Sequence, residues 1–414
     1  MASPPDANTA IGTRKKAPKD PTGSANNRSS RIKPPPHKPS DFCTVPKPAT
    51  LLAAATSLDL PRSFYSYSEI PENRRGFRYT PCEATTLLPS LMYRQIELPP
   101  YRAAVNPHDS SSAALIDGDA LSVSTNKGFR TARANVCVRE GSWYVEFIIE
   151  RAAGDNGGHV RIGWARREAS LDAPVGFDGY SYGIRDVSGE KVHFSRPRPF
   201  MKPFITGDVI GMHISLPPIL SQSLDSQSHP VSRERMPIRY KGQLYFEQFE
   251  YAVTKAMDDL LYPTANELKS SKPPALLGSF IRVYNNGNYV GTAFEDMFAF
   301  MPPYSQLSQS KRTLDDGMCG YFPAISVYRS GSVRFNFGPN FSHPPADLFT
   351  NDNVRPLCER YEEQIAEDIV WDVVDELCFE IEDEADMGPV AANQPVASVL
   401  TQGPSEIKEI IEDL

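Results

Sequence analysis

The amino-acid sequence predicts an all-β protein: an antiparallel β-sandwich followed by a single amphipathic helix. Two observations lead to this fold class. Between about residues 120 and 340, short runs of alternating apolar and polar side chains are separated by turn residues, whereas helical periodicity is confined to residues 359–382. A strand that buries one face alternates in this way, and many short antiparallel strands bury their apolar faces by forming two packed sheets.

The prolines indicate one large folded domain with disordered flanks. The chain holds 38 prolines in 414 residues, clustered toward its ends and in a few internal stretches. This share is roughly twice the usual one, and such stretches bury too little apolar surface to offset the entropy that ordering removes. Although the length alone would allow two or three domains, we therefore expect one, between residues 60 and 345.

A basic tail, residues 1–46, is predicted to be disordered. The first 45 residues carry eight Lys and Arg against three Asp and Glu. Arg14, Lys15 and Lys16 belong to the first of two loose basic clusters. Such clusters contact DNA phosphates or direct nuclear import, but they also occur in solvated tails, and both interpretations stay open.

The strands of the sandwich are predicted from side-chain alternation and from turns. Trp143, Val145, Phe147 and Ile149 share one face of a strand. Further strands flank turn signals: Val209–Leu216 follows Gly207–Asp208, Ile281–Tyr284 and Tyr289–Val290 flank Asn286–Gly287, and Val333, Phe335 and Phe337 follow Ser330–Gly331. The Asn-Gly pair tolerates positive φ and so predicts a hairpin. We expect the aromatic residues Trp143, Trp164, Phe335 and Phe337 to lie in the core.

Two polar, aperiodic segments interrupt this pattern, near residues 219–236 and 303–316, and are predicted to be surface loops. Beyond the sandwich, residues 359–382 are predicted to form a helix. Its apolar stripe recurs every fourth residue, with acidic residues opposite it: Ile365, Ile369, Val373, Leu377 and Ile381. Residues 387–414 are expected to be an acidic flexible tail, whose last ten residues form at most a short helix. The helix either packs back onto the sandwich or lies in the groove of a partner.

Several functional classes lack any sequence signature. The six cysteines are scattered without a C-x-x-C pair, so neither a zinc site nor a disulfide framework is expected. No apolar run approaches the roughly 18 residues that a membrane span needs. A nucleophile elbow, a phosphate-binding glycine loop and a cofactor fingerprint are also missing, so the sequence predicts neither an enzyme nor a bound cofactor.

Four sequence stretches together resemble one family. They are GFRTARANVCVREGSWYVEF, VRIGWARREASLDAPVGFDGYSYGIRD, GDVIGMHISLP and YFPAISVYRSGSVRFNFGP. They resemble a SPRY domain and, more narrowly, the Ash-two/Bre-two subunit of COMPASS-type methyltransferase complexes, over roughly residues 70–345. No segment resembles the PHD-like finger and winged helix of the animal members, so the chain looks like a shorter, fungal-type member.

The resemblance implies a partner-binding surface. Matching positions in the family line a concave surface that grips an acidic segment of the WD-repeat subunit: Phe129, Arg161, Pro174, Phe177 and Arg185. Phe129 and Phe177 stand where animal members have tyrosines, so hydroxyl hydrogen bonds would be lost but apolar walls kept. Arginine binds carboxylates bidentately, although both arginines could instead form internal salt bridges.

The resemblance also implies partners for the helix and for the whole chain. The family places the apolar stripe in a cleft formed by a small Dpy-thirty-type dimer, with Trp371 and Phe379 as further anchors at the edges. The implied function is a non-catalytic nuclear scaffold that supports a SET-domain subunit in methylating lysine four of histone H3 on nucleosomes. The alternative is a SPRY receptor or adaptor of a ubiquitin ligase, but no RING, SOCS-box-like or LisH segment is visible.

Overall fold

The computed structural model describes residues 33–43, 46–53, 62–72, 76–152, 157–222, 231–262, 273–308, 314–346, 348–351, 353–387 and 406–410. The chain divides into two compact units, Met1–Lys33 and Pro34–Leu414, and the fold described here is that of the second unit. Arg14, Lys15 and Lys16 lie outside the described residues.

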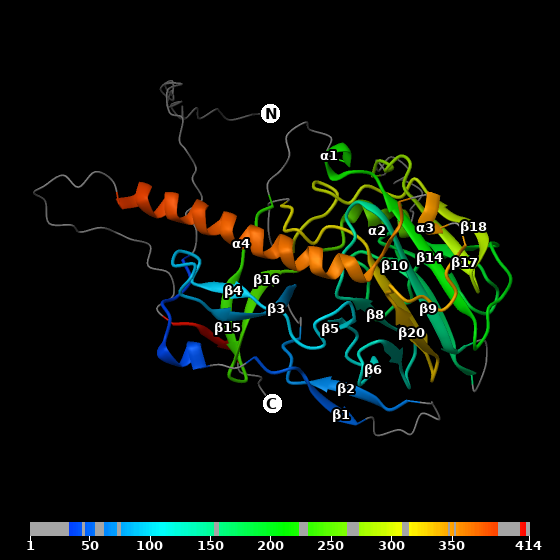
Figure 1. Ribbon diagram of the computed structural model, residues 1–414, viewed down its shortest axis with the longest axis horizontal. Helices are drawn as coiled ribbons and strands as arrows, with labels where there is room; N and C mark the ends of the chain where they lie inside the picture. Colours follow the sequence, from blue (N-terminus) through cyan, green and yellow to red (C-terminus); the bar gives the residue numbers. More distant parts are fainter. Residues whose placement is uncertain are drawn as a thin grey trace, which may run out of the picture. The chain divides into compact units, whose positions relative to one another are not determined.

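Two large sheets form the sandwich (Figure 1). The first contains, in spatial order, β1 (Thr50–Ala53), β2 (Phe64–Ser68), β6 (Leu115–Asp117), β7 (Ser122–Ser124), β20 (Ser332–Asn336), β9 (Gly141–Arg151), β14 (Val209–Leu216), β17 (Phe280–Asn285) and β18 (Asn288–Glu295), with β21 (Arg355–Pro356) beside β9. The second contains β13 (Arg196–Arg198), β12 (Lys191–His193), β11 (Ser181–Arg185), β10 (His159–Ala165), β19 (Phe322–Tyr328), β8 (Arg130–Ala134) and β5 (Val105–Ser110).

The predicted core and the predicted hairpin are confirmed. Trp143, Trp164, Phe335 and Phe337 are buried in one apolar cluster that both sheets share. Asn286 and Gly287 connect β17 to β18 with φ values of 50° and 78°, the left-handed conformations that the Asn-Gly pair tolerates. Apart from the parallel pairing of β21 with β9, both sheets are antiparallel, so the all-β fold class is confirmed.

A third sheet, which the sequence did not predict, lies beside the sandwich. Its strands are β22 (Lys408–Ile410), β15 (Met236–Tyr240), β16 (Gln243–Phe249), β3 (Phe77–Ala84) and β4 (Tyr93–Gln95). The strand β22 pairs in parallel with β15, and Ile410 packs on the buried cluster of β15 and β16. The prediction of a flexible tail with a short helix is therefore wrong at residues 408–410, because these residues complete the edge of a sheet.

The helices are η1 (Pro39–Cys43, 3-10), α1 (Ile219–Gln222), α2 (Lys255–Leu261), α3 (Leu348–Asn351) and α4 (Cys358–Met387). The predicted helix 359–382 corresponds to α4, which continues to Met387. The prediction that residues 1–46 are disordered is wrong at η1, whose buried Asp41 forms an ion pair with Arg239. Among the described residues, no helix is long and apolar enough to cross a membrane.

Both predicted surface loops contain buried charges. Arg233 is buried within the segment 219–236, and Asp315 and Asp316 are buried within 303–316. The prediction of solvated loops is wrong at these residues because each charge has a buried partner of opposite sign. Arg233 binds acidic residues of α4, Asp315 pairs with Arg139, and Asp316 pairs with Arg78.

Candidate partner-binding surfaces

Arg161 projects from the outer face of the second sheet. On β10, Val160, Ile162 and Trp164 point into the core, so Arg161 lies on the opposite face by the alternation of a strand. Its backbone partners are Arg185 on β11 and Ser326 on β19. The register of two neighbouring strands thus places two arginines side by side.

The Arg161 side chain is a half-buried cation. Its guanidinium carbon lies 5.2 Å from the centre of the Phe129 ring, a cation–π distance. Its Nε is buried without a hydrogen-bond partner, and no described carboxylate forms an ion pair with it. Burial, with the neighbouring charge of Arg185, lowers the pKa of Arg161 to about 10. The internal salt bridge that the sequence left open is therefore not seen for Arg161.

Arg185 is paired internally. Its guanidinium forms an ion pair with Glu190, and its Nε donates a hydrogen bond of 2.7 Å to Ser188 Oγ. The side chain is about one third exposed, at 35%. A partner carboxylate would therefore compete with Glu190 at Arg185, whereas Arg161 has no such competitor among the described residues.

Pro174 and Phe177 belong to a loop that crosses the same outer face. The Val175 N–H donates to Ser326 Oγ at 2.8 Å, which fixes the loop next to the backbone partner of Arg161. A Cβ at Gly183 would lie 2.5 Å from the Val175 carbonyl oxygen, so only glycine permits this approach. Phe177 is bonded through its N–H to the Pro174 carbonyl at 2.9 Å. The structure thus brings Phe129, Arg161 and Arg185 together with the loop that carries the other two predicted residues. We call these five the Arg161 surface.

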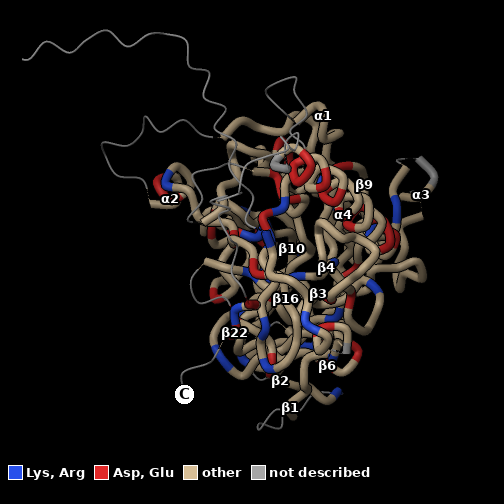
Figure 2. Tube along the Cα trace, turned by 90° about the vertical axis from the view of Figure 1, so that its left-hand side faces the viewer, with Lys and Arg blue, Asp and Glu red and all other residues tan. Residues whose placement is uncertain are grey.

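Part of the acidic face of α4 is buried against the rest of the fold. The buried Arg233 donates hydrogen bonds of 2.9 Å to Asp372 and 2.7 Å to Asp375, and Arg235 donates one of 2.7 Å to Asp372. The Glu376 carboxylate accepts the backbone N–H groups of Ser90 and Leu91 at 2.9 and 2.7 Å. The acidic positions along α4 are visible in Figure 2. These bonds hold α4 against the third sheet by its charged side.

The apolar side of α4 consequently faces outward. Ile369, Val373, Leu377 and Ile381 are 59%, 46%, 54% and 67% exposed. Ile365, the first residue of the predicted stripe, is instead partly buried and packs on the sandwich core. We call the four exposed residues the α4 stripe. An exposed row of this kind on a long helix is typical of a protein-binding surface.

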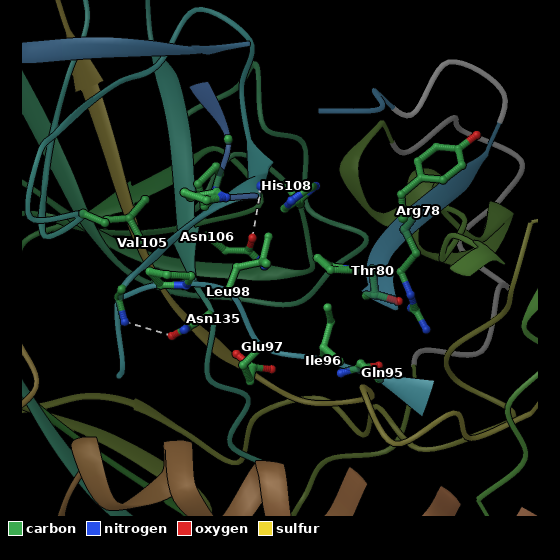
Figure 3. A pocket seen from close by; sticks show the side chains of 18 of the residues that line it. Arg78, Thr80, Gln95, Ile96, Glu97, Leu98, Val105, Asn106, His108 and Asn135 are labelled. Atoms are coloured by element: carbon green, nitrogen blue, oxygen red, sulfur yellow. Dashed lines mark hydrogen bonds between the residues drawn. The ribbon is translucent and has the colours of Figure 1, made fainter. Parts of the chain in front are cut away.

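A cavity of about 370 Å³ lies between the sandwich, the third sheet and α4 (Figure 3). No pattern in the sequence indicated this cavity. Its polar wall includes Arg78, His108, Glu97 and Asp368. Burial lowers the pKa of His108 to about 4, and it raises the pKa of Glu97 to about 7 and that of Asp368 to about 6. The ring of His108 is therefore neutral at physiological pH.

One group of potential metal ligands occurs among the described residues: Asp315, Asp316 and Cys319. Both carboxylates already form ion pairs, Asp315 with Arg139 and Asp316 with Arg78. Burial raises the pKa of the Cys319 thiol well above its usual value. The donor set is thus neutralised by arginines and holds a protonated thiol, which does not suit a cation.

Comparison with known proteins identifies the family. The chain is 38% identical over 467 residues to the COMPASS component cclA of Colletotrichum higginsianum, covering 92% of this chain and 82% of that protein. The chain belongs to the Ash2/Bre2 family of COMPASS components. It is 50% identical over 383 residues to the Set1 complex component ash2 of Schizosaccharomyces pombe, but spans only 57% of that relative's length. The COMPASS component BRE2 of Saccharomyces cerevisiae is 28% identical over 451 residues.

Two other comparisons add little. No family model matches the chain. A human SPRY domain aligns with 55% of the chain and 98% of its own length, at 16% identity and a TM-score of 0.29, which is too low to support any argument. The family assignment therefore rests on the fungal relatives, and it confirms the resemblance seen in the sequence.

The contacts that hold α4 in place escaped prediction from the sequence. Arg233 and Asp372 are separated by 139 residues, and no local pattern connects them. The one available signal was the pair Arg233 and Arg235, whose side chains share one face just before a strand. Two cations on one face of an extended segment indicate an acidic surface nearby, although not which one.

Proposed function

We propose that this chain is a non-catalytic scaffold subunit of a nuclear COMPASS-type complex, where it supports methylation of lysine four of histone H3. Membership of the Ash2/Bre2 family supports the role of a complex component. In this proposal, the Arg161 surface binds the WD-repeat subunit and the α4 stripe binds a Dpy-thirty-type dimer. The SET-domain methyltransferase subunit and the nucleosome are further partners of the chain within the assembled complex.

The α4 stripe is the observation that carries the proposal. The acidic side of the helix is held by Arg233, Arg235 and the loop at Ser90. The stripe on the opposite side is therefore left with no surface of the described chain to cover it. Burying a Leu or Ile side chain contributes roughly 1.5–3 kcal/mol. A partner with an apolar cleft can therefore bind the four residues of the α4 stripe strongly.

The Arg161 surface suits an acidic segment. Arg161 is half-buried beside an aromatic ring and lacks a carboxylate partner among the described residues. A buried cation without a partner is costly, and a carboxylate from another chain would remove that cost. Arg14, Lys15 and Lys16 of the basic tail are proposed to contact nucleosomal DNA, by the attraction of cations to phosphates.

Affinity purification of the tagged chain from its own cells tests the proposal. We expect the methyltransferase, the WD-repeat subunit and the small dimeric subunit to copurify with it. Recovery of ubiquitin-ligase subunits in their place would contradict the proposal and favour the receptor alternative.

A further inference from the structure

We propose that the loop between β3 and β4, residues 85–92, forms a second wall of the binding site for the α4 partner. The partner then binds loop and helix together. This inference rests on the proposed function of α4 and goes beyond it, because it assigns a role to a segment that lies about 270 residues before the start of the helix. The occupant is a protein with an apolar face and a basic rim, here the Dpy-thirty-type dimer.

A groove joins the loop to the α4 stripe. It has a volume of about 360 Å³ and is lined on its apolar sides by Leu87, Leu88, Ile365, Ile369 and Val373. Leu87 is 79% exposed. A single exposed leucine needs no explanation, but Leu87 is continuous with an exposed apolar row on another element. The apolar surface available to a partner is therefore wider than α4 alone.

The loop is ordered and bonded to α4. Within it, the Thr85 N–H donates to the Met92 carbonyl at 2.9 Å, and the Met92 N–H donates to the Leu88 carbonyl at 2.7 Å. Glu376, which is 9% exposed, accepts two backbone N–H groups of the loop. On β4, just after the loop, Gln95 Nε2 donates to Asp368 at 2.9 Å. Loop and helix thus form one preorganised surface, which lowers the entropy cost of binding.

The negative charge around the groove distinguishes between its candidate occupants. Exposed acidic side chains of α4 accompany the apolar stripe: Glu362, Glu380, Glu382 and Glu384. A second copy of this chain would bring the same negative charges and be repelled. The chain's own basic tail has the right charge but almost no apolar side chains to fill the groove. A different protein that carries an apolar face within a basic rim satisfies both requirements.

Calorimetric titration of the full-length chain with the purified Dpy-thirty-type dimer tests the inference. The variant Leu87→Asp loses one apolar contact and places a charge in the groove, so its affinity should fall at least about tenfold. The matched control is Leu277→Asp, because Leu277 is 78% exposed and lies in the turn before β17, away from the groove. This control should bind like the unaltered chain.

A second pair of variants tests the preorganised surface. Glu376→Ala should speed amide hydrogen exchange at Ser90 and Leu91 and weaken binding severalfold, whereas Glu359→Ala, at an exposed position in the first turn of the same helix, should do neither. Faster exchange with unchanged affinity would overturn the role of the loop. Unchanged affinity of Leu87→Asp would overturn it as well, provided that Leu377→Glu still abolishes binding. If Leu377→Glu also binds normally, the proposed function of α4 fails first.

Discussion

At the scale of single residues, the half-buried Arg161 differs from the buried arginines of the sandwich. Arg133 donates hydrogen bonds of 2.8 and 2.6 Å to the two carboxylate oxygens of Asp109, and Arg167 forms an ion pair with Glu250. Burial raises the pKa of Asp109, but the charges of Arg133 and Arg167 outweigh it and bring the pKa down to about 2. Arg161 has an aromatic ring beside it and no such carboxylate. A cation in this position is a strong candidate for contact with a partner.

Reversing the charge of Arg161 should therefore affect binding and leave folding intact. We expect Arg161→Glu to weaken binding of an acidic peptide from the WD-repeat subunit at least about tenfold, because a charged hydrogen bond contributes roughly 1.5–3 kcal/mol and a like charge adds repulsion. Calorimetry measures the affinity, and Arg198→Glu, an exposed arginine at the edge of the second sheet, is the control. Equal affinities for the two variants, with equal melting transitions, would remove Arg161 from the binding surface.

Glu97 gives a prediction for the pH dependence of stability. Burial, helped by the charge of Asp368, raises the pKa of Glu97 to about 7 from an ordinary value of 4.5. A carboxyl group with a raised folded-state pKa binds its proton more tightly when folded, so it costs stability as pH rises from about 4.5 to 7. We expect Glu97→Gln to stabilise the chain by about 1–2 kcal/mol at pH 8, less than the full linkage value because the cavity is partly open to water.

The stabilisation by Glu97→Gln should shrink toward zero as pH falls to about 4.5 and below, because the Glu97 carboxyl of the folded chain is then protonated and as neutral as glutamine. Thermal or urea melts of the variant and the unaltered chain across this pH range give the comparison. The glutamine oxygen can still accept the hydrogen bond that Tyr361 donates to Glu97 at 3.1 Å. A stability difference that does not change with pH would mean that Glu97 is not the titrating group.

At the scale of elements, α4 shows what the sequence could and could not predict. The stripe that recurs every fourth residue predicted the helix and its apolar side, because both depend on local spacing. The sequence also placed acidic residues opposite the stripe, but it did not indicate that some of them are buried. Asp372 and Glu376 are buried because Arg233 and the backbone at Ser90, both distant in the sequence, meet them in the fold.

The sheets also divide into strands that local spacing predicts and strands that only distant pairing creates. Strands of the sandwich core were predicted from alternation, because Trp143 and Phe335 each occupy the inward positions of a regular strand. The third sheet was not predicted, since β3, β16 and β22 come from three distant parts of the chain. Strand pairing across such distances leaves no local signature. The Arg161 surface was identified only through the family resemblance, and the groove beside Leu87 was not identified at all.

Removing Arg233 should release the C-terminal part of α4. The variant Arg233→Ala leaves Asp372 and Asp375 without one of their cations, and breaking a buried ion pair costs about 3–5 kcal/mol. We expect faster amide exchange along α4 from Asp372 onward, with the core strands of the sandwich unchanged. The control Arg355→Ala breaks exposed ion pairs with Glu359 and Glu363, each of which should contribute less than about 1 kcal/mol. Unchanged exchange in α4 would show that Arg233 does not hold the helix.

At the scale of the whole molecule, the two proposed binding surfaces lie on different parts of the fold. The Arg161 surface is built on the outer face of the second sheet, and the α4 stripe lies on a helix that is held by the third sheet. The charged side of α4 is used for attachment, so its apolar side stays available. Separate surfaces on one compact unit suit a scaffold, because each partner can bind without displacing the other.

The most direct test of this account is the binding of the Dpy-thirty-type dimer to Leu377→Glu, measured by calorimetry on the full-length chain. Leu377 is 54% exposed on the α4 stripe, so a carboxylate there should not disturb folding, yet its desolvation in an apolar cleft costs several kcal/mol. We expect binding to be lost while the melting transition stays unchanged. Normal binding by the variant, or a lowered melting transition that shows the stripe packing within the chain, would contradict it.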